Sequence, residues 1–350
     1  MATIEKMPRS AFRRGPGIVE AWGSRVELGD AMSSYAAWPE PTAIIVDGPY
    51  GVGGYPGDPP TASGLAEWYA PHVAEWSRRA SPQTTLWFWG TELGWANVHP
   101  VLDLHGWRYR VCHVWDKGIG HIAGNVNSKT IRSFPVVSEV CVQYVRDAVL
   151  PAQDGKLLEM KAWLRYEWAR AGLPLYLTNE AAGVRNAATR KWFTQCHLWY
   201  YPPPDAMVQV AAYATERGKP TDRPYFSIDG KRPLTEEAWA RLRSKWYHEH
   251  GVTNVWREPS VRGGERLKSG LKALHACQKP ISLTDRIIRA STDPGDIVWD
   301  IFGGLCSGVV ASIRSGRRCF SAEVNPDYFA VAAERVRAAA SEVSARDHFA

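Results

Sequence analysis

The sequence predicts an α/β protein in which a mainly helical insertion interrupts one mostly parallel sheet. Short apolar strands alternate with amphipathic helices in two stretches, residues 1–150 and 263–350. Between them, residues 151–262 lose this alternation and read as a series of helices. We therefore expect the two outer stretches to be halves of one domain and the middle stretch to stand apart.

The first stretch follows a strand–helix rhythm. Its first strand, TAIIVD at residues 42–47, is a run of apolar residues that ends in an acid and the tight turn GPYG, as buried parallel strands do. A helix over 65–80 and the strand TTLWFWG at 84–90 complete a βαβ unit. A second helix, a strand that reaches residue 117 and a strand over 138–146 continue it.

The middle stretch begins with a strong helical pattern over residues 156–172. Residues 178–196 then contain a cap at Thr178, a turn at Gly183 and a second cap at Asn186, which outline a helix-turn-helix. An ordinary helical hairpin has the same outline, and both interpretations stay open.

The composition of the middle stretch is basic and rich in tryptophan. It holds 17 Lys and Arg against 12 Asp and Glu, and seven of the 17 Trp residues. This composition fits a surface that contacts bases and phosphates, and it fits a small Trp-filled core equally well. The whole chain has a formal charge of +6 and a pI near 9.0, which agrees with a polyanionic partner without requiring one.

The last stretch places a glycine-rich turn between a strand and a helix. The strand DIVWDIFGG at 296–304 precedes a helix over 307–316, and a further strand ends at Glu323, about 20 residues after the turn. This is the layout of the adenosine-binding half of a Rossmann-like sheet, in which the turn approaches the ligand and the acid accepts hydrogen bonds from the ribose. Dehydrogenases share this layout.

The cysteines and the apolar runs exclude other classes of protein. The six cysteines form no CxxC pair and no cluster with histidine, so we expect reduced thiols and no metal site. The chain has no run of 18 apolar residues, and its first 15 residues contain no apolar leader. We expect a soluble, cytoplasmic protein with no membrane partner.

Five motifs together resemble one family, the DNA amino-methyltransferases that act on adenine N6 or cytosine N4. In the β arrangement of this family the catalytic motif comes first, a target-recognition region follows, and the S-adenosylmethionine (AdoMet) motif comes last. The resemblance covers about 25–150 and 265–338. The matching segments, in order, are VDGPYG, VWDKG, HACQKPISL, GDIVWDIFGG and GRRCFSAEVNPDYFAVAAERV.

The resemblance implies roles for particular residues. Asp47 and the carbonyl of Gly48 would accept the two hydrogens of the target amine, so that its lone pair points at the methyl group, and Tyr50 would stack on the flipped base. Lys279 would lie near the methionine end of AdoMet, although a solvated lysine is the alternative. The catalytic residues implied are Asp47, Gly48, Pro49 and Tyr50, and the AdoMet-binding residues are Asp300, Phe302, Gly304, Glu323, Lys279 and Asp47.

Three features depart from the family pattern. Gly48 replaces a proline, and we expect a softer loop there. Ile301 also replaces a proline, and Cys306 replaces a glycine where the family lets the ligand approach the backbone. Either that loop is re-routed or cofactor binding is weakened. A second motif, DPPT at 58–61, lacks a preceding strand and a following aromatic residue, so we assign it to a surface loop.

Several functional alternatives remain. Adenine N6 is the favoured target because the catalytic motif begins with Asp, whereas cytosine N4 enzymes of the family usually carry Ser there. A DNA-binding relative with a decayed site and a nicotinamide-dependent oxidoreductase are the other classes. The implied partner is double-stranded DNA, with Arg185, Arg190 and Lys191 expected to contact it. A cognate restriction endonuclease and a homodimer are left open.

Overall fold

The chain divides into two compact units. The computed structural model describes residues 17–53, 57–122, 130–194, 197–269, 272–275 and 277–347. Unit 1 combines Met1–Arg146 with Ser244–Ala350, and unit 2 is Asp147–Arg243. The expected insertion, 151–262, therefore extends too far, because residues 244–262 belong to unit 1 and supply one of its strands.

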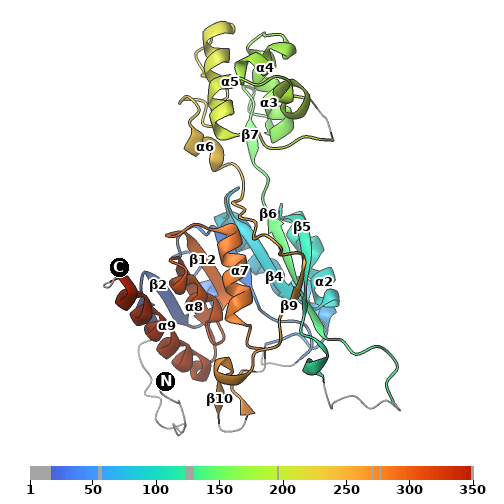
Figure 1. The fold of residues 1–350 in the computed structure, drawn as a ribbon, viewed down its shortest axis with the longest axis vertical. Helices are drawn as coiled ribbons and strands as arrows, with labels where there is room; N and C mark the ends of the chain where they lie inside the picture. Colours follow the sequence, from blue (N-terminus) through green and yellow to red (C-terminus); the bar gives the residue numbers. More distant parts are fainter. Residues whose placement is uncertain are drawn as a thin grey trace. The chain divides into compact units, whose positions relative to one another are not determined.

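Unit 1 is built on a nine-stranded sheet of order β1-β2-β13-β12-β3-β4-β6-β5-β9 (Figure 1). The strands from β2 to β4 in this order are parallel, β6 is antiparallel to both neighbours, and β9 is parallel to β5. Because β3 pairs directly with β12, the two outer stretches share one sheet, as predicted. The strands are β1 Ile18–Ala21, β2 Ser24–Leu28, β3 Ala43–Val46, β4 Thr85–Gly90, β5 Arg108–Asp116, β6 Ser138–Val145, β9 Val255–Arg257, β12 Ile297–Phe302 and β13 Arg318–Glu323.

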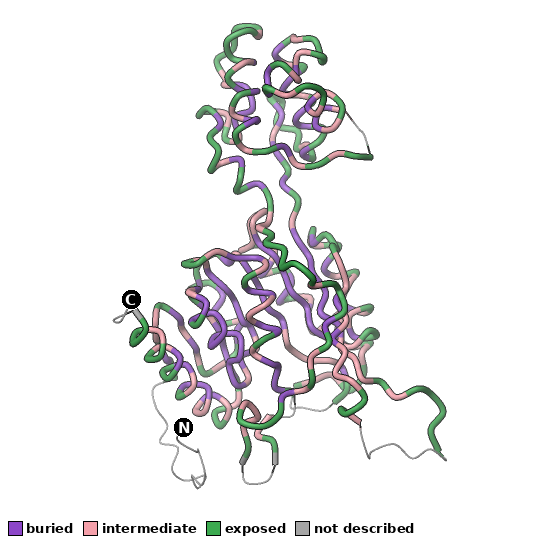
Figure 2. The backbone as a smooth tube through the Cα atoms, in the orientation of Figure 1, coloured by how far each residue is buried: buried purple, intermediate pink, exposed green. Residues whose placement is uncertain are grey.

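Helices cover both faces of this sheet. The helices α1 (Leu65–Arg79) and α2 (Glu92–Leu104) pack on one face, and α7 (Ile281–Ser291), α8 (Ser307–Arg314) and α9 (Pro326–Asp347) pack on the other. Alternate residues of β3 enter different cores, which is why its four positions are all apolar and all buried. Figure 2 shows the buried strands between the two helical layers.

The strand directions define two edges of the sheet. We call the edge where β3, β12 and β13 end the carboxyl edge. The antiparallel strand β6 begins at this edge, because Ser138 lies opposite Asp116 at the end of β5. It finishes at the other edge, where Val145 lies opposite Thr85 at the start of β4. A short hairpin, β10 Lys268–Ser269 with β11 Lys272–Ala273, precedes α7.

Unit 2 is a small helical unit with a core rich in tryptophan. Trp163, Trp168, Trp192 and Trp239 are all buried in this core. The alternative of a Trp-filled core therefore explains these four residues, and they offer no surface for bases. The elements of unit 2 are the hairpin β7 Val149–Pro151 with β8 Leu157–Glu159, and the helices α3 Met160–Arg170, α4 Thr178–Ala181, α5 Pro204–Arg217 and α6 Glu236–Ala240.

The expected helix-turn-helix over 178–196 is wrong in its described part, up to residue 194. Thr178 lies inside the four-residue helix α4 instead of capping it. After the turn at Gly183, the chain forms a single π-helical turn over Ala188–Trp192. Five residues are too few for the helix that enters a DNA groove, so the capping pattern indicated turns without indicating helix length.

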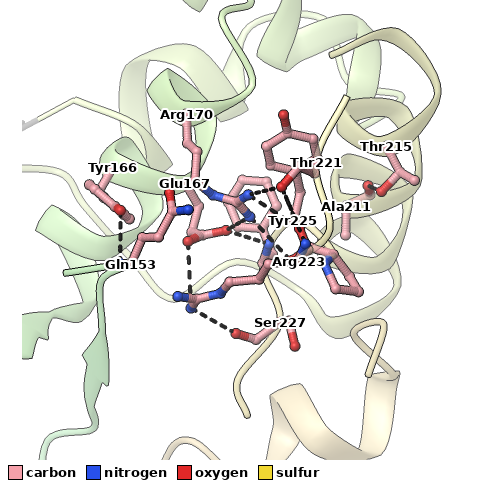
Figure 3. Close-up of polar contacts among 12 residues, drawn as sticks. Gln153, Tyr166, Glu167, Arg170, Ala211, Thr215, Thr221, Arg223, Tyr225 and Ser227 are labelled. Atoms are coloured by element: carbon pink, nitrogen blue, oxygen red, sulfur yellow. Dashed lines mark hydrogen bonds and ion pairs between the residues drawn. The ribbon is translucent and has the colours of Figure 1, made fainter. Parts of the chain in front are cut away.

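A buried carboxylate organises unit 2. Glu167 on α3 is fully buried, and its Oε2 accepts hydrogen bonds from Arg170 Nη2 at 2.7 Å and from the backbone N–H of Phe226 at 2.8 Å. Arg223 Nη2 lies 3.8 Å from the other oxygen, Oε1. Figure 3 shows both guanidinium groups directed at Glu167. Since Phe226 has a positive φ of 57°, this hydrogen bond holds a backbone conformation that a phenylalanine rarely adopts.

The substitution Glu167→Ala should destabilise unit 2 by about 3 kcal/mol, because it leaves two half-buried arginines without their carboxylate. Urea denaturation of the full chain, followed by tryptophan fluorescence, measures this loss. Glu216→Ala is the matched control, since Glu216 is exposed and lies 4.0 Å from Arg217, and it should change stability by less than about 0.5 kcal/mol. Equal midpoints for the two variants would contradict the assigned role of Glu167.

Candidate active site

A cavity of about 610 Å³ opens at the carboxyl edge of the sheet. Its volume lies in the range of about 300–1,000 Å³ that is typical of small-molecule sites. Its walls come from the loop after β3, the helix α1, the segment before α7, the β12–α8 turn and the end of β13. The predicted site residues of unit 1 all line it, namely Asp47, Gly48, Pro49, Tyr50, Lys279, Asp300, Phe302, Gly304 and Glu323.

Asp47 directly follows β3 and is held through one of its two oxygens. Its Oδ1 accepts hydrogen bonds from Lys279 Nζ at 2.6 Å and from the Tyr50 hydroxyl at 3.1 Å. Among the described residues, Oδ2 has no hydrogen-bond partner, so it is available to a ligand in the cavity. Lys279 is only 6% exposed, which contradicts the alternative of a solvated lysine.

A second carboxylate, Glu139 on β6, completes the charge balance. Its Oε2 lies 3.3 Å from Lys279 Nζ and 3.0 Å from the Tyr50 hydroxyl, and its Oε1 is ion-paired with Lys117. Burial alone would raise the pKa of Glu139, but Lys279 and Lys117 more than offset this effect and lower the pKa to about 2. Two ammonium groups therefore face two carboxylates beside the cavity.

The sequence interpretation missed Glu139 and Lys117. The available signal was an acid at the second position of the mostly apolar strand SEVCVQYV. A lysine also stands immediately after the end of β5. Neither pattern predicts the partner, because the pairing depends on β6 lying antiparallel between β4 and β5.

The protonation of Lys279 and Tyr50 follows from this network. Burial by itself lowers the pKa of Lys279. The charges of Asp47 and Glu139 more than offset this effect, so the pKa is raised overall and Lys279 stays protonated. Burial and the same two carboxylates raise the pKa of Tyr50 well above its usual value. The neutral Tyr50 hydroxyl therefore accepts from Lys279, at 3.0 Å, and donates to a carboxylate.

Gly48 is required by close packing. A Cβ at this position would lie 2.6 Å from the ring of Phe302 and 2.6 Å from the Tyr69 hydroxyl. The same Tyr69 hydroxyl donates to the carbonyl of Pro49 at 3.1 Å. The Phe302 ring therefore occupies the place that a proline ring at position 48 would need. The sequence, which predicted a softer loop, could not show these contacts.

The DPPT segment is a surface loop, as expected, but it also contacts the catalytic loop. Asp58 lines the cavity, and its carboxylate accepts hydrogen bonds from the backbone N–H of Gly51 at 2.7 Å and of Val52 at 3.1 Å. Gly53 also donates its N–H to the carbonyl of Pro59 at 3.1 Å. Asp58 therefore fixes the backbone directly after Tyr50.

Cys306 turns its side chain away from the cavity. It has a positive φ of 56°, is fully buried, and packs in the core under α8. Its neighbours Leu305 and Ser307 line the cavity, and Cys306 does not. The side chain therefore does not block a ligand. The replacement of glycine costs about 1–2 kcal/mol of left-handed backbone strain.

Glu323 ends β13 and is held by the turns beside it. Its Oε2 accepts the N–H of Gly304 and its Oε1 accepts the N–H of Asn325, each at 2.7 Å. Burial raises the pKa of Glu323, and these two hydrogen bonds oppose the effect. Because a carboxylate has about four lone-pair sites, each oxygen can still accept a hydroxyl of a ligand.

Asp300 lies on β12 near the carboxyl edge of the sheet, and its buried carboxyl group lies against Gly308 of α8. Burial, and then the charge of Asp47, raise its pKa to about 8. The N–H of Gly308 donates to its carboxyl group and opposes this shift. A Cβ on Gly308 would collide with the same carboxyl group, so a glycine is needed there. At neutral pH without a ligand, Asp300 is therefore mostly protonated.

Three aromatic side chains form one wall of the cavity, which we call the aromatic wall: Trp68, His72 and Phe302. The rings of Trp68 and His72 are stacked at 4.8 Å between centroids, and the Phe302 ring lies 5.4 Å from His72. Burial lowers the pKa of His72 to about 4, so its ring is neutral. Trp68 lies on the helix that the sequence predicted over 65–80, but the pattern could not show that the stack faces a cavity.

The three predicted DNA-binding cations belong to unit 2. Arg185 and Arg190 are exposed and Lys191 is half-buried, with its ammonium group 5.6 Å from the centroid of the Tyr200 ring. Among the described residues, no group of three or more His, Cys, Asp or Glu could hold a metal ion. In the same part of the chain, no helix is long and apolar enough to cross a membrane.

Comparisons with known proteins agree with the motifs. A family model described as DNA methylase matches residues 42–334. The type II methyltransferase M1.MboII of Moraxella bovis is 30% identical over 109 residues, which are 30% of this chain and 42% of that protein. The DNA adenine methyltransferase YhdJ of Escherichia coli is 38% identical over 89 residues, 25% of this chain and 29% of that protein. The matches span less than half the length of either relative.

A solved structure shares the fold. The PvuII DNA methyltransferase, described as cytosine-N4-specific, superposes with a TM-score of 0.50 at 13% identity, over 89% of this chain and 86% of its own. At this identity the likeness concerns the fold alone, which is an α/β, Rossmann-like sheet as predicted.

The substitution Gly48→Ala should destabilise the protein by about 1–3 kcal/mol, because the added methyl group overlaps the Phe302 ring and the Tyr69 hydroxyl. Urea denaturation measures the effect. Gly264→Ala is the control, since a Cβ there meets nothing within 4 Å. Adding Phe302→Leu to Gly48→Ala should recover part of the loss. A Gly48→Ala variant as stable as the control would show that the loop has room for a side chain.

The contribution of Asp300 to the stability of the ligand-free protein should decrease as the pH rises from about 4 to 8. In this range the folded state holds a proton on Asp300 that the unfolded state has released. One such group contributes at most about 1.4 kcal/mol per pH unit. In urea denaturation, the free energy of unfolding of wild type minus that of Asp300→Asn should therefore fall over this pH range, whereas the difference between wild type and the control Asp285→Asn should stay constant. Parallel profiles for wild type and Asp300→Asn would refute the raised pKa.

Proposed function

The chain belongs to the N6/N4 family of DNA methylases, and from this premise we propose that it transfers a methyl group from AdoMet to an exocyclic amine of double-stranded DNA. One observation carries the proposal. Asp47 offers a single open oxygen to a cavity that also contains Glu323 and the glycine turn after β12. Adenine N6 is the favoured target, because the catalytic motif begins with Asp, and cytosine N4 is the alternative.

The residues around the cavity fit the cofactor. Glu323 would accept hydrogen bonds from the ribose hydroxyls through its remaining lone pairs. Gly304 has a positive φ of 51° and presents backbone to the cavity, and the aromatic wall supplies an apolar surface for a purine. Asp300 would lie beneath the same turn. When bound, AdoMet supplies a methyl group on a positively charged sulfur.

The target amine needs activation because its lone pair is delocalised into the ring. Oδ2 of Asp47 would accept one amine hydrogen and the carbonyl of Gly48 the other, which directs the lone pair toward the methyl group. Lys279 and Tyr50 hold Oδ1 and so fix the rotation of the carboxylate. Tyr50 would also stack on the extruded base. The amine loses one proton during or after the transfer.

Unit 2 would contribute to DNA binding through three cations, of which two are exposed and one is half-buried. Arg185, Arg190 and Lys191 are accessible to phosphates, and we retain them as proposed DNA contacts. A cytoplasmic location is part of the same proposal, whereas a cognate restriction endonuclease and a homodimer stay open, and the site requires neither.

The test is methylation of DNA from a strain that lacks the modification, with tritiated AdoMet. Wild type should label the DNA, and long-read sequencing should then identify the base and its sequence context. Asp47→Ala should lower the rate by roughly 10²-fold or more, because the acceptor for the amine is lost, while AdoMet affinity stays within a few-fold. Glu40→Ala, which removes an exposed acid outside the cavity, is the control.

The outcomes separate the three classes of function. DNA binding without label would indicate a decayed relative. Hydride transfer that does not depend on DNA would indicate an oxidoreductase. An Asp47→Ala variant that retains more than a few per cent of the activity would remove Asp47 from the mechanism.

A further inference from the structure

We propose that two segments of unit 1 form a DNA-binding surface beside the cavity, with Phe134 as a wedge that enters the duplex when the target base leaves it. The first segment is the β5–β6 connection, described at 117–122 and 130–137, and the second is residues 257–269. We call them the wedge segment and the basic segment. The proposal rests on the proposed function and adds to it the residues that open the duplex.

The wedge segment is anchored in the catalytic network. It leaves the sheet at the carboxyl edge, where Asp116 lies opposite Ser138. Lys117 precedes it and Glu139 follows it, and these two side chains are ion-paired. Glu139 in turn contacts Tyr50 and Lys279. Both ends of the wedge segment are therefore fixed beside the group that would receive the target base.

The basic segment packs against the first part of the wedge segment. It leaves the sheet at the same edge, because β9 is parallel to β5 and Arg257 is paired with Asp116. Ser260 Oγ is hydrogen-bonded to His121 Nδ1 at 2.9 Å. The guanidinium group of Arg262 lies against Gly120, where an added Cβ would be 2.9 Å from Nη2. The two segments therefore form one surface.

This surface is positively charged. Lys117 is neutralised by its ion pair with Glu139. The other described residues of the two segments hold two acids, Glu258 and Glu265, against five cations, Arg132, Arg257, Arg262, Arg266 and Lys268. Burial lowers the pKa of His121, and the charges of Lys117 and Arg262 lower it further, while only Glu139 opposes them. The positive charges that disfavour a proton on His121 would attract an anion to the same place. A phosphate backbone is the polyanion that a DNA methylase meets.

The same surface exposes large apolar side chains. Phe134 is 96% exposed and Ile119 is 73% exposed. Exposed apolar groups are common singly, but an exposed aromatic ring in the positively charged wedge segment, four residues before the strand that carries Glu139, favours nucleic acid over a protein partner. Proteins that distort DNA insert such rings between base steps. Phe134 would fill the gap that the extruded base leaves.

The decisive experiment compares two substrates for Phe134→Ala. One duplex carries the target base in its normal pair, and the other carries it opposite an abasic site, where extrusion needs less energy. On the paired duplex the variant should methylate at least tenfold more slowly than wild type. On the abasic duplex it should stay within about twofold of wild type. Leu104→Ala is the matched control, because Leu104 is 83% exposed and ends α2, before β5 begins at the opposite edge.

The basic segment has its own readout. Arg257→Ala combined with Lys268→Ala should make the logarithmic salt dependence of DNA binding shallower by up to about two units, at about 0.9 per phosphate contact. AdoMet affinity should be unchanged in both sets of variants, which shows that they fold.

The results distinguish this inference from the proposed function. If wild type methylates neither duplex, the proposed function fails. If wild type is active and Phe134→Ala loses the same factor on both duplexes, or loses nothing on the paired one, the wedge is overturned. An unchanged salt slope in the double variant would remove the basic segment from the DNA contact.

Discussion

The ion pair between Lys279 and Asp47 is the interaction on which the rest of the site depends. It joins the two sequence halves of the sheet, since Asp47 follows β3 and Lys279 precedes α7, 232 positions away. Buried charges are costly unless they are paired and hydrogen-bonded. The surrounding fold meets this requirement with a second pair, Glu139 and Lys117, so that the four charges balance beside the cavity.

The network gives Asp47 an asymmetric environment. Its Oδ1 is occupied by Lys279 and Tyr50, which leaves the other oxygen as the acceptor that faces the cavity. The loop behind it is held in the same manner, because Asp58 binds the two amides after Tyr50. Acceptors that are oriented before a ligand arrives need little reorganisation during a reaction. The geometry therefore suits the orientation of a weakly nucleophilic amine.

Local patterns predicted β3 to β6, β12 and β13 and the motifs at their ends, because a buried strand and a glycine turn each leave a signature in consecutive residues. They did not predict β1, β2 and β9. The sequence also predicted that the two outer stretches share one sheet, and in the structure β3 pairs with β12. Glu139 could not be found in this way, because its contacts depend on how β6 pairs with β4 and β5. Asp58 could not be found either, because it lies on a loop that folds back onto Gly51 and Val52. In unit 2, the capping pattern at Thr178 indicated turns but not the length of the helices between them. Four of the tryptophans pack in the core of this unit, so they do not form a surface for bases.

The departures from the family pattern have packing partners in this chain. Gly48 leaves room for the Phe302 ring, and Tyr69 then holds the carbonyl of Pro49. Cys306 adopts the left-handed conformation that a glycine would have supplied, and its thiol is directed into the core. The hypothesis of a decayed site was motivated by these two residues. Since each substitution is accommodated by its neighbours and the cavity behind them stays open, neither residue supports loss of the site.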